Sequence, residues 1–172
     1  MRSVTSECSA AHASVSRRSV YAVDTPGFTY LNAEESMTEI GRSVYLSSPG
    51  PHAFLIVFAL NMRCTGMWQL IPDDIESLFG EKVLKYSIIL FTHGDLLEED
   101  PIEELIEENY VVRCAVQQCG GRFHVYNNRD ENNREQVNDL LQKIDSMIEQ
   151  NGGGHYSNLM FQDAQIFGYT II

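Results

Sequence analysis

The chain has 172 residues, of which 44% are hydrophobic and 21% charged, and its formal net charge at pH 7 is −12. This size and composition are typical of a single globular domain with a hydrophobic core. The negative charge argues against broad electrostatic binding to nucleic acid or to an anionic membrane. No window approaches the ~20 apolar residues of a transmembrane helix.

The cysteines fit the same broad class. The sequence has four of them, with no C-x-x-C pair and no nearby histidine at zinc-finger spacing. We expect buried or free thiols in a reducing compartment, and therefore a cytoplasmic protein. We expect no transmembrane segment, because no apolar window is long enough.

The first half of the chain predicts alternating strands and helices. A weakly alternating edge strand is expected at residues 5–15 and a second strand at 19–23, which runs into Asp24. A helix follows at 32–46, where Asn32 and Glu35 form a candidate cap. Residues 53–60 are continuously apolar, as in strands buried on both faces of a sheet. Residues 68–79 are typical of a helix that is interrupted or begins at Pro72.

The second half continues the alternation. Buried or short strands are expected at 86–91 and 122–126, and helices at 102–117 and 131–150, the last with one continuous apolar stripe. Strands that alternate with helices indicate an α/β fold with a mostly parallel sheet and helices on both faces. Ligands then bind at the carboxyl ends of the strands.

The first candidate site loop follows the strand at 19–23 and consists of Asp24, Thr25, Pro26 and Gly27. An aspartate at a strand end can hold Mg²⁺, and the Gly27 amide can approach a phosphate because no side chain obstructs it. The alternative is an ordinary turn, since Asp, Pro and Gly all favour turns.

Two further loops follow later strands. Thr92, His93, Gly94 and Asp95 end the strand at 86–91. A carboxylate there can accept hydrogen bonds from both N1–H and the 2-amino group of guanine, whereas adenine offers neither donor in that arrangement. The alternative is a solvated loop acid. Asn127 and Asn128 follow the strand at 122–126, where an amide could meet guanine O6, although Asn is also common in plain loops.

A phosphate-binding loop is absent from this sequence. No G-x-x-x-x-G-K-[ST] motif occurs in it. Of the three lysines, only Lys82 has a glycine shortly before it, and Val83 stands where the motif needs Ser or Thr.

Several segments together resemble the immunity-associated GTPases, that is, the GIMAP family of the avirulence-induced-gene type, and particularly its fish-like members. The resemblance covers roughly residues 2 to 165, and its most specific part is the Ser-Pro-Gly-Pro-His box at 48–52, which Ras-like domains generally lack. The matching segments are 24–27, 46–53, 79–81, 91–96, 118–122 and 126–128.

This resemblance implies a Ras-like P-loop GTPase fold, a three-layer sandwich that binds GTP or GDP with Mg²⁺. It assigns Asp24 and Gly27 to the γ-phosphate and magnesium loop, and Asp95 to base selection with His93 and Gly94 beside it. Asn127 or Asn128 would close over the base, and Thr5 would be the magnesium threonine. It also implies homo- or heterodimers with family members.

Compared with the family pattern, the sequence starts after the first strand, the P-loop and the first helix. We expect a partial G domain at 1–165, an apolar tail at 166–172, and a truncated gene model or splice form. The missing strand is central in a Ras-like sheet, so we expect that its two neighbours pair directly, that another segment fills the gap, or that the chain is a fragment.

The same gap puts hydrolysis in doubt, and Phe28 stands where Ras-like enzymes carry a water-orienting glutamine. We assign no catalytic residue and expect micromolar or weaker nucleotide binding. The alternative is a non-hydrolysing interaction module that dimerises with complete family members.

Overall fold

A computed structural model describes residues 5, 7–27, 33–61, 71–97, 100–130 and 132–162. Four of the predicted features lie outside the described residues: the tail at 166–172, Phe28, the Asn32 cap and residues 68–70 of the predicted helix. None of the helices within the described ranges combines the length and apolar character needed to cross a membrane.

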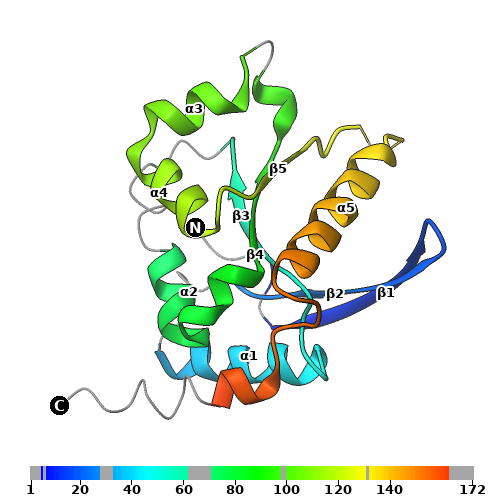
Figure 1. Ribbon diagram of the computed structural model, residues 1–172, viewed down its shortest axis with the longest axis vertical. Coiled ribbons are helices and arrows are strands. Elements are labelled where there is room, and N and C mark those ends of the chain that lie inside the picture. The colour runs from blue at the N-terminus through cyan, green and yellow to red at the C-terminus, as the bar shows by residue number, and fades with distance from the viewer. Residues whose placement is uncertain are drawn as a thin grey trace.

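The centre of the fold is a parallel sheet of three strands in the order β3-β4-β5 (Figure 1). Its strands are β3 (Phe54–Ala59), β4 (Ser87–Thr92) and β5 (Phe123–Tyr126). Phe58 of β3 is in register with Phe91 of β4, which is in register with Val125 of β5. The apolar runs therefore form the predicted parallel strands, and all three carboxyl ends meet at one edge.

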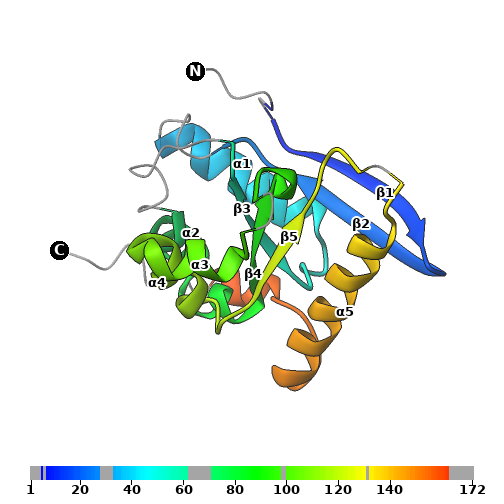
Figure 2. The same ribbon diagram turned by 90° about the horizontal axis from the view of Figure 1, so that it is seen from above.

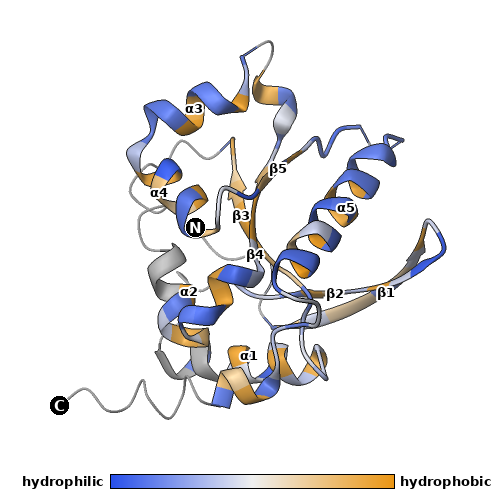
Figure 3. Cartoon of the chain, viewed as in Figure 1, coloured by the Kyte–Doolittle hydropathy of each residue, from blue (hydrophilic) through white to orange (hydrophobic). Residues whose placement is uncertain are grey.

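Helices cover both faces of this sheet. Helix α5 (Glu135–Gln150) lies on one side, and α2 (Ile71–Phe79), α3 (Ile102–Glu108) and α4 (Tyr110–Gln118) lie on the other in both views (Figures 1 and 2). Apolar positions of α5 turn toward the sheet while its outer face is hydrophilic (Figure 3). The predicted α/β layering is confirmed for the described residues.

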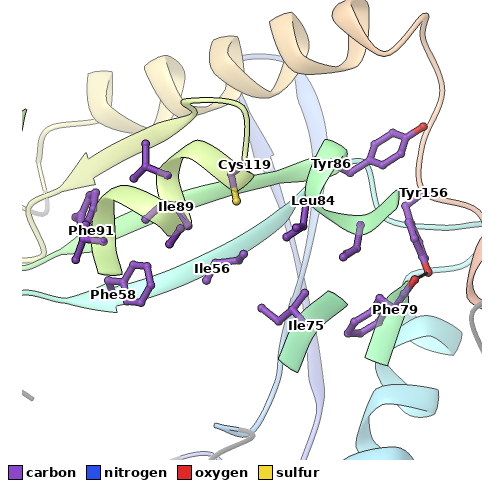
Figure 4. Close-up of a cluster of buried hydrophobic side chains, with 14 of the residues drawn as sticks. Ile56, Phe58, Ile75, Phe79, Leu84, Tyr86, Ile89, Phe91, Cys119 and Tyr156 are labelled. Atoms are coloured by element: carbon purple, nitrogen blue, oxygen red, sulfur yellow. Dashed lines mark hydrogen bonds between the residues drawn. The ribbon is translucent and has the colours of Figure 1, made fainter. Parts of the chain in front are cut away.

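The main core fills the space between the sheet and the α2–α4 side. Ile56, Phe58, Ile89 and Phe91 from the strands are all buried there (Figure 4). Buried side chains from α1 (Ala33–Leu46), α2, α3, α4 and the 3-10 helix η2 (Glu81–Tyr86) complete this cluster. Tyr156 is 1% exposed and its hydroxyl donates to the Phe79 carbonyl, which anchors the chain after α5 to this core.

Two predicted helices have different bounds. The helix expected at 102–117 is divided at Asn109, whose side-chain oxygen accepts hydrogen bonds from the amides of Val111 and Val112 and so caps α4. The helix expected from residue 131 begins at Glu135, because turn hydrogen bonds from Asn133 to Asp130 and from Arg134 to Asn132 precede it.

The amino-terminal strands form a separate sheet. Strands β1 (Ser9–Val15) and β2 (Arg18–Asp24) make an antiparallel hairpin, and neither pairs with the described strands of the parallel sheet. The hairpin turn is held against α5 instead. Arg18 makes a bidentate ion pair with Asp145, at 2.9 and 2.5 Å, and both views show the hairpin beside α5 (Figures 1 and 2).

Strand β3 is buried on one face only, so the expectation of burial on both faces was wrong. Ile56 and Phe58 point into the core, whereas Leu55 is 40% exposed and Val57 is 52% exposed. Because β3 pairs with β4 alone among the described strands, no described strand lies along its other edge, and Leu55 and Val57 remain partly exposed.

Candidate functional site

The carboxyl edge of the parallel sheet gathers loops from three strands. Asn61 follows β3, and its side-chain nitrogen lies 3.3 Å from Nε2 of His93, which follows β4. The backbone N–H of His93 donates to Oδ1 of Asn128 after β5, at 3.0 Å. The structure thus brings together the loops at residues 92–95 and 127–128, as expected from their positions at parallel strand ends.

The loop after β5 is fixed to the start of α5 by one side chain. Gln136 Oε1 accepts from the Asn127 amide at 3.0 Å, and Gln136 Nε2 donates to the Asn127 carbonyl at 3.2 Å. Asn127 Oδ1 in turn accepts from the Arg129 amide at 2.9 Å, closing an Asx turn. The side-chain oxygens of Asn127 and Asn128 therefore hold the loops in shape.

The loop after β4 has a constrained backbone. His93 has φ of 61°, in the left-handed region that costs a non-glycine residue free energy. A Cβ on Gly94 would lie 2.6 Å from Cγ1 of Val125. The loop therefore packs directly on β5, and only glycine permits this approach at residue 94.

Asp95 is the acidic group at this edge. It lies in the one-turn helix η3 (Gly94–Leu97), and its side chain is 15% exposed. Both carboxylate oxygens are buried, and neither accepts a hydrogen bond from a described residue. Arg129 approaches Oδ2 to 3.0 Å as an ion pair, without the geometry of a hydrogen bond. Because a buried carboxylate without donors is unfavourable, this group is suited to a ligand that brings N–H donors.

Asp24 belongs to the other sheet. It ends β2, with Thr25, Pro26 and Gly27 directly after it, and Thr5 Oγ1 donates to Asp24 Oδ2 at 2.9 Å. The structure thus pairs the two residues predicted to hold magnesium, but at the end of hairpin strand β2 rather than at the edge of the β3-β4-β5 sheet.

Asp24 and Thr5 supply two oxygen atoms, fewer than a metal ion needs from its ligands. Within the described ranges, no group of three or more His, Cys, Asp and Glu side chains is placed to hold a metal ion. A carboxylate and a hydroxyl suit Mg²⁺ chemically, because this ion commonly takes its remaining ligands from phosphates and water.

His124 of β5 is the buried histidine nearest in sequence to these loops. It is 5% exposed, and its Nε2 has no hydrogen-bond partner among the described residues. Burial lowers the pKa of His124, and the nearby Lys143 charge lowers it further. The imidazole is therefore neutral at pH 7 and acts as part of the core rather than as a charged ligand.

Sequence reasoning missed three residues of the edge: Asn61, Arg129 and Gln136. Asn61 carried the same signal as Asp95, a polar residue just after an apolar run. Arg129 directly follows Asn128, but nothing in the spacing indicated a contact with residue 95. Gln136 lies on the predicted helix, and its link to Asn127 depends on the loop conformation.

The fold is that of an α/β protein with a parallel sheet. Its polar loops converge at the carboxyl ends of the parallel strands, where such sheets usually bind ligands. A profile described as the AIG1 family matches residues 1–169. The chain therefore belongs to the AIG1 family, and the resemblance found from its motifs is confirmed.

Individual relatives agree with this assignment. Immune-associated nucleotide-binding protein 9 of Arabidopsis thaliana is 34% identical over 157 residues, which cover 85% of this chain and 45% of that protein. GTPase IMAP family member 8 of Homo sapiens is 32% identical over 146 residues, covering 82% of this chain and 22% of its own length.

A third relative has broader coverage. Immune-associated nucleotide-binding protein 8 of Arabidopsis thaliana is 32% identical over 169 residues, which cover 92% of this chain and 48% of the relative. The chain thus spans less than half the length of each of these three relatives.

Proposed function

We propose that the chain binds guanine nucleotides, GDP or GTP, with the base at the carboxyl edge of the β3-β4-β5 sheet. The observation that carries this proposal is the buried carboxylate of Asp95, both of whose oxygens lack a hydrogen-bond donor among the described residues. The names of the relatives, which include nucleotide-binding proteins and a GTPase, support the same class of ligand.

The chemistry of Asp95 selects the base. Guanine presents two parallel donors, N1–H and the 2-amino group, and a carboxylate accepts both with charge-assisted hydrogen bonds. Adenine has no N–H at N1 and no 2-amino group. Asn127 or Asn128 would close over the base, because the loop that carries them is bonded to the loop that carries Asp95.

The phosphate end of the proposed site is sparser. Asp24, Thr25, Pro26 and Gly27, with Thr5, are the residues we propose for the phosphate and Mg²⁺ side. The sequence contains no P-loop lysine or magnesium serine, so we propose nucleotide binding in a G domain over residues 1–165 and no hydrolysis by these residues alone.

Calorimetric titration of the full chain with GDP, GTPγS and ATP in Mg²⁺ tests this proposal. We expect binding of both guanine nucleotides with a dissociation constant in the micromolar range or weaker, and no heat of binding with ATP. Equal affinity for ATP, or no binding of any nucleotide to folded protein, would contradict it.

A second candidate is an interaction module that pairs with another family member. It is favoured by the exposed apolar strip of Leu55 and Val57 on β3, whose outer edge has no described partner. Sedimentation of an equimolar mixture with a full-length AIG1-family protein tests it. We expect a complex that Val57→Lys weakens, whereas a mixture that sediments as two separate species would contradict an interaction role.

A further inference from the structure

The ion pair between Arg129 and Asp95 joins two very different side chains. The Arg129 side chain is 77% exposed, while that of Asp95 is 15% exposed, and Nη1 lies 3.0 Å from Oδ2. The cation therefore reaches in from solvent, and the acid lies inside the protein.

The surrounding contacts show which partner can move. Asp95 lies on η3, whose first residue, Gly94, packs closely on Val125. The backbone of Arg129 is fixed by its hydrogen bond to Asn127 Oδ1, but its long side chain rotates about bonds that solvent does not restrict. Displacement of this ion pair therefore requires only that the guanidinium swing away.

A guanidinium group presents N–H donors in one plane to a carboxylate. The N1–H and 2-amino group of guanine present the same arrangement of donors. Arg129 Nη1 already lies 3.0 Å from Oδ2, so a base that uses both carboxylate oxygens competes with the guanidinium for that oxygen. We propose that Arg129 is a built-in competitor for guanine, which neutralises Asp95 in the free protein and must leave before the base can use both carboxylate oxygens. This inference rests on the guanine-nucleotide binding proposed above.

Competition from Arg129 at Oδ2 of Asp95 should weaken the binding of guanine but not that of hypoxanthine. Hypoxanthine has N1–H but no 2-amino group, so it needs a single carboxylate oxygen and can bind at Oδ1 while Arg129 stays on Oδ2. Guanine needs both oxygens and must displace the arginine. Arg129 therefore lowers the affinity of the site for guanine relative to its affinity for hypoxanthine.

Calorimetric titration of full-length Arg129→Gln with GDP and with IDP tests this inference. We expect Arg129→Gln to bind GDP up to about fivefold more tightly than wild type, a ratio that corresponds to about 1 kcal/mol. IDP affinity should not increase. A general charge effect has the opposite sign, because removing a positive charge weakens binding of any anionic nucleotide.

The matched control is Arg134→Gln, which removes the same charge from an exposed residue just before α5. We expect this variant to bind GDP no more tightly than wild type. If Arg129→Gln and Arg134→Gln bind GDP equally, or if Arg129→Gln strengthens GDP and IDP alike, the competitor role is overturned while guanine binding itself stands. If wild type and both variants bind no guanine nucleotide, the proposed function fails and the inference falls with it.

Discussion

The carboxyl edge of the parallel sheet and the loop after β2 were both predicted as nucleotide loops, but they differ in how they are held. At the sheet edge, hydrogen bonds link the loops of β4 and β5 and tie the β5 loop to α5. At the hairpin, Asp24 accepts a hydrogen bond from the hydroxyl of Thr5, and neither hairpin strand pairs with a described strand of the parallel sheet. The base-reading half of the proposed site is thus preorganised, and the phosphate half is only partly assembled.

Gly94→Ala should disturb the preorganised half most strongly. The new Cβ would lie 2.6 Å from Val125 Cγ1, and overpacking of this kind costs about 1–3 kcal/mol. We expect that loss in the free energy of unfolding, measured by urea denaturation, together with weaker GDP binding.

The same substitution at Gly41, in α1, is the control, because a Cβ there meets nothing within 4 Å. Gly41→Ala should be neutral or stabilising by up to ~1 kcal/mol. The double variant Gly94→Ala/Val125→Ala should recover part of the lost GDP affinity. Loss of stability without any change in GDP affinity would show that the β4 loop does not shape the site.

Acid should weaken the parallel sheet through His124. The pKa of His124 is lowered from 6.5 in the folded protein, so the unfolded chain takes up the proton first as the pH falls. The contribution of neutral His124 to the free energy of unfolding is fully present above pH 6.5. It is lost as the pH falls from 6.5 toward the folded pKa, by at most ~1.4 kcal/mol per pH unit for one proton.

We therefore expect the free energy of unfolding of wild type to fall more steeply below pH 6.5 than that of His124→Gln. Urea denaturation at a series of pH values from 7.5 downward measures both slopes. Identical slopes would mean that His124 is not the group that takes up the proton.

Arg18→Gln should affect the hairpin and leave the sheet edge alone. It removes the bidentate ion pair with Asp145 that holds the hairpin turn to α5, and half-exposed pairs of this kind contribute about 0.2–1 kcal/mol. Thermal unfolding should show a small loss of stability and calorimetry an unchanged GDP affinity. Arg17→Gln, which removes equal charge from the same turn, is the control. A fall in GDP affinity specific to Arg18→Gln would show that the position of the hairpin affects GDP binding at the sheet edge.

Asp24→Asn should have the smallest effect on base binding. In EDTA, where no Mg²⁺ is bound, we expect GDP affinity to change by less than about twofold, since a loss below ~0.4 kcal/mol corresponds to that ratio. The increase in affinity that Mg²⁺ gives to wild type should be reduced in the variant. A large loss of GDP affinity in EDTA would instead place Asp24 at the base-binding edge of the parallel sheet.

Much of the fold was predictable because periodicity and composition determine element type locally. The apolar runs at β3 and β4, the stripe of α5 and the strand–helix alternation all led to the observed parallel sheet. The convergence of the loops that carry Asp95 and Asn128 could also be predicted from the sequence, because parallel strands share one carboxyl edge.

Other features depend on tertiary context that the sequence does not display. Asn109 divides α3 from α4 through its side-chain cap, although no glycine or proline marks the break. Exposure of Leu55 and Val57 depends on which segments cover β3. The contact of Arg129 with Asp95 depends on the turn made by Asn127, so neither residue's local pattern could reveal it.

Reversal of base specificity at Asp95 would show that this carboxylate reads the base. In Asp95→Asn, the side-chain oxygen still accepts from N1–H, but the amide now donates to the 2-oxo group of xanthine instead of accepting from the 2-amino group of guanine. With charge-assisted hydrogen bonds worth about 1.5–3 kcal/mol, we expect GDP affinity to fall at least about tenfold and XDP affinity to rise.

The measurement is calorimetric titration of wild type, Asp95→Asn and the exposed control Asp100→Asn with GDP and with XDP. We expect the preference to change from GDP to XDP in Asp95→Asn alone, with Asp100→Asn indistinguishable from wild type. A variant at residue 95 that still prefers GDP, with undiminished affinity, would contradict the assignment of the base to this edge of the sheet.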